Sequence, residues 1–330
     1  MALTRGLKSS AALISWKPTG RLQQTLAGCV ELTGLGLHSG KSSKVMISPE
    51  FARKGRYFDC NSNCSIPASI DFALRPSPLS TTLSKDGVQV RTVEHLLSAL
   101  EATGVDNCRI QIHSLDSDDS QVEIPILDGS SRQWVDLILE VGLRVAVDEC
   151  GRSCERLAPH LNEPYHARVD DAFIAAFPSP ELRITYGIHF PQVSEIGSQW
   201  VSFPLLDDSV YVQQIASSRT FCLLEQVLGA LQVEQMREAG LIKGGSLENA
   251  IVCSASEGWL NGPLRLPDEP CRHKVLDLIG DLSLCAGSGN QGLPVAHIVA
   301  YKASSLMVSS TFVCGGHALH TDFARGLAKS

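Results

Sequence analysis

The stretch Arg272-His273-Lys274-Val275-Leu276-Asp277-Leu278-Ile279-Gly280-Asp281 predicts an amphipathic helix. At about 100° per residue, its apolar side chains form one stripe that can pack on a sheet, opposite a face of polar and small residues. His273 and Asp277 lie four residues apart on the polar face, where neighbouring side chains can bind one cation. The stripe consists of Val275, Leu278, Ile279 and Leu282, and the polar face of His273, Asp277, Gly280 and Asp281.

The earlier stretch Thr92-Val93-Glu94-His95-Leu96-Leu97 repeats this arrangement. Val93, Leu96, Leu97 and Leu100 form an apolar stripe, and His95 lies across the helix from it. We therefore expect two helices that face each other with a metal ion between them, His95 being the third ligand. Three protein ligands with one open position are typical of catalytic zinc. Each motif taken alone is more often a solvated histidine or a surface ion pair, and only the two helices together favour the metal site.

Composition sets limits on the class of protein. The chain has 330 residues, 44% of them hydrophobic and 19% charged, which suits one large or two medium soluble domains. Its net charge of −7 argues against a nucleic-acid-binding protein, which would be basic. An apolar run of about 18 residues, which a membrane anchor needs, is not present. The eleven cysteines show no disulfide pattern, so we expect reduced thiols.

The first residues differ from the rest of the chain. Residues 1–21 contain Arg5, Lys8, Lys17 and Arg21, and no acidic residue precedes Glu31. This pattern is typical of an organellar transit peptide, and a disordered tail is the alternative. We expect a mitochondrial address, with the plastid as second choice, and a fold that begins after residue 21.

The remaining pattern predicts two α+β domains, at 22–147 and 164–330, joined by a polar linker at 148–163. Each is expected to be a sheet with helices on one face. Strands are expected near 45–48, 88–90, 109–113, 123–127, 172–177, 182–190 and 296–300, and helices near 92–103, 131–141, 223–239 and 273–284.

Seven motifs occur in one order along the chain. They are Gly34-Leu35-Gly36-Leu37-His38-Ser39-Gly40-Lys41, Thr92-Val93-Glu94-His95-Leu96, Glu123-Ile124-Pro125-Ile126-Leu127-Asp128-Gly129-Ser130, Ser218-Arg219-Thr220-Phe221, Gly244-Gly245-Ser246, the stretch quoted first, and Gly316-His317-Ala318-Leu319. From about Gln23 to the C-terminus the chain resembles the UDP-3-O-acyl-N-acetylglucosamine deacetylases, zinc hydrolases of lipid A synthesis. The resemblance implies two similar domains whose helix layers are sandwiched between two outer sheets. It also implies a UDP-linked acylated amino sugar as substrate and an insert near 251–270 that helps form an acyl-chain passage.

The resemblance also implies roles for particular residues. Glu94 would be the general base, because it points about 100° away from the ligand His95 and can reach the attacking water. Thr220 would donate to the oxyanion, and Asp281 would orient His317, the acid that protonates the leaving amine. Lys274 and Phe221 would contact the substrate, although Phe221 is equally well explained as a core residue. Ferrous iron also suits two imidazoles and one carboxylate.

One departure from the family pattern precedes His317. Residues 304–315 form an insertion between Ala303 and Gly316. A displacement of His317 by about 1 Å can cost about 10²-fold in rate. The alternative to an active deacetylase is therefore an impaired homologue that binds metal and the acyl-sugar nucleotide without turnover. A zinc amidohydrolase with another acylated substrate is a third hypothesis. The oligomeric state is not predicted.

Overall fold

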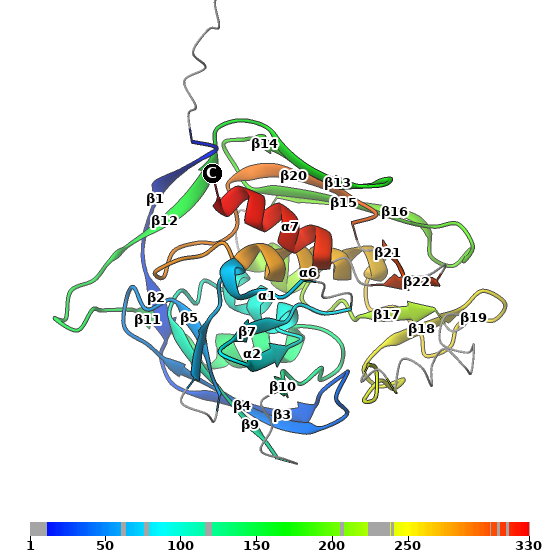
Figure 1. Cartoon of the computed structure of the whole chain (residues 1–330), viewed down its shortest axis with the longest axis horizontal. Helices are drawn as coiled ribbons and strands as arrows, with labels where there is room; N and C mark the ends of the chain where they lie inside the picture. The colour runs from blue at the N-terminus through cyan, green and yellow to red at the C-terminus, as the bar shows by residue number, and fades with distance from the viewer. Residues whose placement is uncertain are drawn as a thin grey trace, which may run out of the picture.

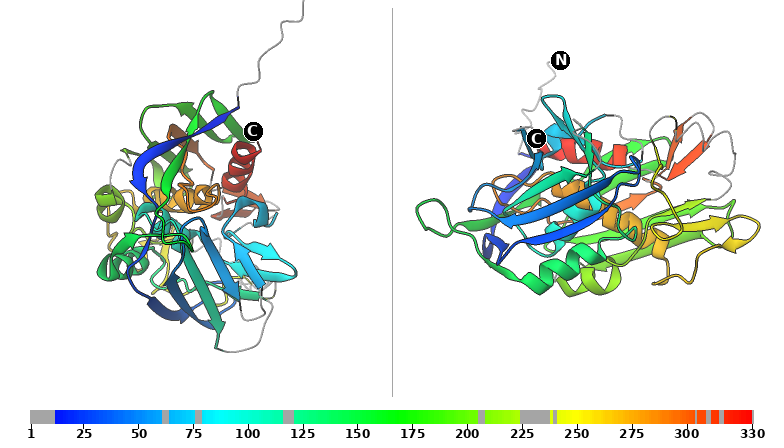
Figure 2. Two further views of the ribbon diagram at one scale, coloured as in Figure 1. Left: turned by 90° about the vertical axis from the view of Figure 1, so that its left-hand side faces the viewer. Right: turned by 90° about the horizontal axis from the view of Figure 1, so that it is seen from below.

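Two five-stranded sheets form the outer layers of the molecule, and helices lie between them (Figure 1). The computed structural model describes residues 12–60, 64–75, 79–115, 121–204, 208–223, 238, 241–303, 305–308, 311–314 and 317–329. The left view in Figure 2 shows helix α6 (Glu269–Ser283) enclosed between the sheets. The predicted α+β fold, with helices between two sheets, is confirmed.

The two sheets share one topology. In each sheet, the strand that comes last in the sequence lies in the centre, antiparallel to the second strand and parallel to the third. The N-terminal order is β3 (Val30–Leu35), β4 (Ser42–Pro49), β9 (Cys108–Ser114), β5 (Arg56–Cys60) and β6 (Cys64–Pro67), and the C-terminal order is β13 (Tyr165–Val169), β14 (Ala172–Pro178), β20 (Ala296–Tyr301), β15 (Arg183–Phe190) and β16 (Gly197–Pro204). The halves are therefore similar in architecture without an apparent sequence repeat.

Strand residues alternate between the helix layer and the outer surface, as the two-residue period of a strand requires. Val45 and Ile47 of β4 are fully buried, and so are Ile184 and Ile188 of β15. Thr185 of β15 points the other way and bonds polar groups on the outer face. Burial on one face therefore fixes the register of both sheets.

Helices α1 (Glu94–Ala102) and α6 pack against each other at the centre, as predicted for the two helices that carry the candidate ligands. Gly280 makes this possible, because a Cβ atom there would lie 2.1 Å from the carbonyl oxygen of Glu94. Each of these helices precedes the central strand of its half. The layer also contains α2 (Arg132–Val141), α3 (Asp208–Gln214) and α7 (His317–Ala328).

The prediction that the fold begins after Arg21 is wrong. Strand β1 (Ile14–Leu22) pairs antiparallel with β12 (Glu155–Leu161), which lies inside the predicted linker. Neither segment shows a clean apolar alternation, because most of β1 is exposed and the buried positions of β12 include Arg156 and Pro159. Each became a strand only by pairing with the other, which neither sequence shows by itself.

Two predicted elements were misplaced. The strand expected at 123–127 ends early, since β10 covers only Gln121–Glu123. Pro125 has no N–H to donate, and Leu127 has a positive φ of 55°, so the chain turns away from the sheet. The helix expected near 223–239 falls mostly on residues outside the described part of the chain, and Leu223 itself ends strand β17 (Phe221–Leu223).

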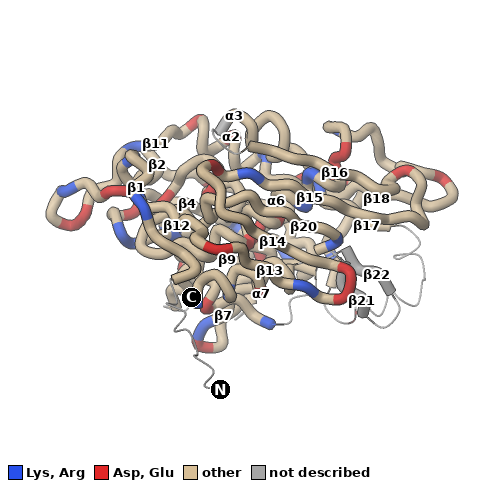
Figure 3. The backbone as a smooth tube through the Cα atoms, turned by 90° about the horizontal axis from the view of Figure 1, so that it is seen from above, with Lys and Arg blue, Asp and Glu red and all other residues tan. Residues whose placement is uncertain are grey.

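Short strands complete the fold. They are β2 (Gln24–Leu26), β7 (Leu83–Lys85), β8 (Val88–Arg91), β11 (Leu143–Val145), β18 (Ile251–Ser254), β19 (Gly258–Trp259), β21 (Ser305–Val308) and β22 (Thr311–Cys314), with a 3-10 turn at Ile70–Phe72. None of the described helices has the length and apolar character that crossing a membrane requires. No disulfide joins the ten cysteines whose side chains the structure describes. In the view of Figure 3, basic and acidic residues are interspersed along the described backbone.

Candidate metal centre

The three predicted metal ligands meet between α1 and α6. His95 Nε2 lies 3.5 Å from Asp277 Oδ1, and His273 Nε2 lies 3.4 Å from the same oxygen. The two imidazole rings are perpendicular, with centroids 4.9 Å apart. All three residues are buried, and their ligating atoms lie within 4.8 Å of one another. Two segments almost 180 residues apart in the sequence are thus joined at one point.

The orientation of each group suits a cation. His273 Nδ1 lies 3.0 Å from the carbonyl oxygen of Ser218, so Nδ1 carries the proton and the Nε2 lone pair faces the centre. Asp277 Oδ2 accepts a hydrogen bond from Lys274 Nζ at 3.0 Å. Asp277 Oδ1 is buried and accepts no hydrogen bond among the described residues. A buried carboxylate oxygen without a donor requires compensation, and two imidazole nitrogens beside it make a divalent cation the fitting partner.

Electrostatics at the centre keep the ligands in their metal-binding forms. Burial alone would raise the pKa of Asp277, but His273 and Lys274 outweigh it and hold that pKa well below its usual value. Burial lowers the pKa of His273 to about 3, so this imidazole is neutral near pH 7. A carboxylate anion and a neutral imidazole are the protonation states in which these residues bind metals.

Glu94, Asp281 and His317 lie next to the candidate ligands. The Nε2 atom of His317 lies 3.6 Å from Glu94 Oε1, and its Nδ1 atom lies 2.9 Å from Asp281 Oδ2. Burial raises the pKa of Glu94. Burial alone would lower the pKa of His317, but the carboxylates of Asp281 and Glu94 outweigh it and raise that pKa to about 9. A carboxylate base and an imidazolium acid are thus held side by side.

The remaining candidate site residues, Thr220, Lys274 and Phe221, lie in two different environments. Thr220 and Lys274 line a small cavity of about 20 Å³ together with Glu94, His95 and His317. That volume accommodates about one water-sized group. Phe221 is buried against Phe190, with Lys274 Nζ 5.6 Å from the centre of its ring. Phe221 is therefore packed as a core residue, and its ring lies next to the ammonium group of Lys274.

Sequence reasoning missed two members of this site. Thr81 donates its backbone N–H to Glu94 Oε2 at 3.0 Å and its hydroxyl to Asp281 Oδ1. His320 places Nδ1 2.8 Å from Asp281 Oδ2, and its Nε2 lies 3.0 Å from the hydroxyl of Tyr186. The three-residue spacing of His317 and His320 would have indicated His320, had α7 been predicted as a helix. Thr81 carries no local signal.

The insertion at 304–315 does not separate His317 from its partners. Among the described residues, strands β21 and β22 pair only with each other, as a two-stranded ribbon apart from the sheet that contains β20. Helix α7 then begins at His317, whose ring contacts Asp281 as described.

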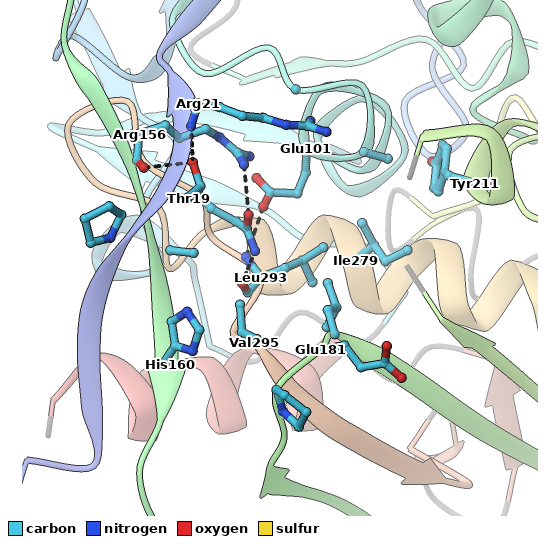
Figure 4. Close-up of a pocket in the computed structure, with 17 residues that line it drawn as sticks. Thr19, Arg21, Glu101, Arg156, His160, Glu181, Tyr211, Ile279, Leu293 and Val295 are labelled. Atoms are coloured by element: carbon cyan, nitrogen blue, oxygen red, sulfur yellow. Dashed lines mark hydrogen bonds between the residues drawn. The ribbon is translucent and has the colours of Figure 1, made fainter. Parts of the chain in front are cut away.

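A second cavity, of about 450 Å³, lies at the other end of α1 (Figure 4). Arg156 of β12 and Glu101 of α1 both line this cavity, and each forms a salt bridge. Arg156 contacts Asp106 at 2.7 Å, and Glu101 contacts Arg56 at 2.7 Å. None of the candidate site residues is among its described lining residues, so the metal centre is a separate feature.

Comparisons with known proteins agree with this geometry. A family model described as UDP-3-O-acyl N-acetylglycosamine deacetylase matches residues 23–329. A protein of Arabidopsis thaliana named probable UDP-3-O-acyl-N-acetylglucosamine deacetylase 1, mitochondrial, is 58% identical over 97% of this chain and 92% of its own length. The UDP-3-O-acyl-N-acetylglucosamine deacetylases of Trichormus variabilis and Thermosynechococcus vestitus are 47% and 44% identical, over 86% and 93% of this chain and 94% of each relative. The chain belongs to the UDP-3-O-acyl-N-acetylglucosamine deacetylase family.

Proposed function

We propose that this chain is a zinc-dependent amidohydrolase that removes the N-acetyl group from a UDP-linked 3-O-acyl-N-acetylglucosamine and releases acetate. The observation that carries the proposal is the convergence of His95, His273 and Asp277 beside Glu94 and His317. Membership of the deacetylase family supports the same reaction and substrate class.

His95, His273 and Asp277 would hold the ion. When bound, zinc supplies Lewis-acid polarisation of the amide carbonyl and a lower pKa for the attacking water. Glu94 takes a proton from that water, and its raised pKa makes the carboxylate a stronger base. The water oxygen forms a bond to the carbonyl carbon, and the C–N bond then breaks.

His317 delivers its proton to the departing nitrogen, which leaves as the free amine of the sugar. Asp281 holds the imidazolium in place through Nδ1, which leaves Nε2 directed toward Glu94. Thr220 lines the same cavity and would donate its hydroxyl to the oxygen that becomes negative during attack. Lys274, which lines the same cavity, would contact the substrate, and residues 251–270 would guide the acyl chain.

The test measures acetate release from the UDP-linked sugar by the full chain and by Glu94→Gln, alongside metal content. We expect one zinc per chain in both proteins and a loss of about 10²–10⁴-fold in kcat for the variant, the usual contribution of a general base. A metal-loaded wild-type chain without turnover, or a variant with full turnover, would refute the proposal. Equal turnover of unrelated N-acetyl compounds would favour a different substrate. Reconstitution with ferrous iron under anaerobic conditions tests the alternative metal.

We also propose that the protein is mitochondrial, as the name of the Arabidopsis relative and the basic N-terminal residues favour. Because Ile14–Leu22 forms strand β1 in the fold, removal of a leader would occur before Ile14. Mass spectrometry of the N-terminus, after import into isolated mitochondria, tests both points. A mature N-terminus beyond Ile14 would contradict the placement of the cut.

A further inference from the structure

Glu123 is a buried carboxylate that binds two segments distant from it in the sequence. Its Oε1 atom accepts the backbone N–H of His38 at 2.9 Å and the hydroxyl of Thr92 at 2.8 Å. Its Oε2 atom accepts the backbone N–H of Ser39 at 2.7 Å. The residue is 4% exposed, so water contributes little to the solvation of its carboxylate. One carboxylate thus joins the loop at 36–41 to the start of the metal-bearing helix α1.

Thr92 connects Glu123 to the metal centre, because it donates to Glu123 and lies just before helix α1. It follows β8 and comes two residues before Glu94, the first residue of α1. Its φ of 59° places a β-branched residue in the left-handed region, where such residues are rarely found. A strained residue of this kind persists only where surrounding contacts hold it. The hydroxyl bond to Glu123 is such a contact, and it fixes the direction in which Glu94 and His95 enter the site.

The loop at 36–41 is held equally closely. A Cβ atom at Gly36 would lie 2.4 Å from Glu123 Oε2, so the carboxylate occupies the space that a larger residue would need. Leu37 lines the cavity at the metal centre. Its carbonyl oxygen accepts the N–H of Gly244 at 2.9 Å, which connects the loop to the C-terminal half. Glu123 therefore fixes one wall of the cavity as well as the helix that carries a ligand.

The surroundings of Glu123 favour its ionised form. Burial alone would raise the pKa of this carboxyl, but His38 and the hydrogen bonds from Ser39 and His38 outweigh it and lower the pKa. An ionised carboxylate accepts stronger hydrogen bonds than an amide oxygen. A glutamine at this position would also turn an NH₂ group toward backbone N–H groups that can only donate.

We propose that Glu123 is a positioning residue of the metal centre, which holds Thr92 in its left-handed conformation and keeps the Leu37 loop against α1. The effect on turnover rests on the proposed deacetylase function. The effect on metal binding does not, since metal affinity is measured without substrate.

The experiment compares the full chain with Glu123→Gln and with the matched control Glu101→Gln. Glu101 is a buried carboxylate near the other end of α1, and it accepts the N–H groups of Gly292 and Leu293 at 2.9 and 3.0 Å. Zinc affinity is measured by competition with a chromophoric chelator, Tm by calorimetry, and kcat and KM by acetate release.

We expect Glu123→Gln to weaken zinc binding by about 10–100-fold, the range for residues that orient metal ligands. The loss in turnover should appear mainly in kcat, because the catalytic groups are displaced together. Glu101→Gln should lower Tm while zinc affinity stays within about threefold of the wild-type value, a difference below the 10–100-fold range. An unchanged zinc affinity in Glu123→Gln, with only a lower Tm, would overturn the proposal.

If Glu123→Gln fails to fold, two milder substitutions at Thr92 test the same proposal. Thr92→Val removes only the hydroxyl that Glu123 accepts, and Thr92→Ser retains it. Zinc affinity should fall in Thr92→Val, and Thr92→Ser should recover most of that loss. Equal zinc affinity in the two variants would contradict the proposed role. A wild-type chain that binds zinc but releases no acetate would refute the proposed function, and the zinc measurements would still decide the role of Glu123.

Discussion

The Nδ1 atom of His317 lies 2.9 Å from Asp281 Oδ2 in the buried centre of the molecule. Burial alone would lower the pKa of this histidine, but Asp281 and Glu94 raise it to about 9 from an ordinary value of 6.5. His317 is therefore protonated at neutral pH and can act as an acid there. The interaction of protonated His317 with these carboxylates adds to the free energy of unfolding. This contribution is fully present below pH 6.5 and is lost as the pH rises through about 9.

The first prediction concerns Asp281→Asn. Removal of the negative charge lowers the pKa of His317, so the decline of kcat at alkaline pH should move to lower pH by about one unit or more. The pH profile of acetate release measures this shift. Asp106→Asn is the matched control, because Asp106 is a buried carboxylate that pairs with Arg156 away from the metal centre. An alkaline limb that stays in place in Asp281→Asn would contradict the assignment of His317.

A second prediction concerns removal of the metal. A ligand that binds only the folded state stabilises it by about 4 kcal/mol at a free concentration 1,000 times its Kd. A chelator should therefore abolish acetate release and lower Tm, and one equivalent of zinc should restore both. His273→Ala removes a ligand, so the chelator should leave the Tm of that variant unchanged. An equal fall in Tm in both proteins would show that the chelator acts elsewhere.

A third prediction tests the contact between α1 and α6. Gly280→Ala places a methyl group against the Glu94 carbonyl and forces the helices apart. We expect a loss of about 1–3 kcal/mol in the free energy of unfolding, the usual cost of overpacking, with weaker zinc binding. Denaturant unfolding and a zinc titration measure the two effects. Gly287→Ala is the control, since its Cβ would have no heavy atom within 4 Å. Similar effects in both variants would contradict the interpretation.

The central part of the fold and site was predictable because its signals are local. Helix α6 carries the proposed ligand pair at four-residue spacing opposite an apolar stripe, and His95 lies opposite the stripe of α1. Such patterns report which face of a helix is buried. Resemblance to the family supplied His317 and Asp281, which no spacing within the chain connects.

The parts that were not predictable depend on contacts between distant segments. Strand β1 exists through its pairing with β12, more than 130 residues later. Thr81 joins Glu94 and Asp281 from a loop with no regular pattern. The role of Glu123 depends on the loop at 36–41 folding back onto it, and nothing in the motif that begins at Glu123 indicates this contact. Periodicity describes one element at a time and contains no information on such pairings.

The last prediction concerns the insertion before α7. A chain without residues 304–315 should release acetate at a rate within a few-fold of the full chain, because His317 already contacts Asp281 in the presence of the β21–β22 ribbon. Both chains should also lose activity at the same alkaline pH, since the carboxylates that raise the pKa of His317 are common to both. The two proteins are compared by pH profile at equal zinc content. A gain of about 10²-fold on deletion, the cost of a displacement of about 1 Å, would mean that the ribbon holds His317 out of position. The natural chain would then be the impaired homologue.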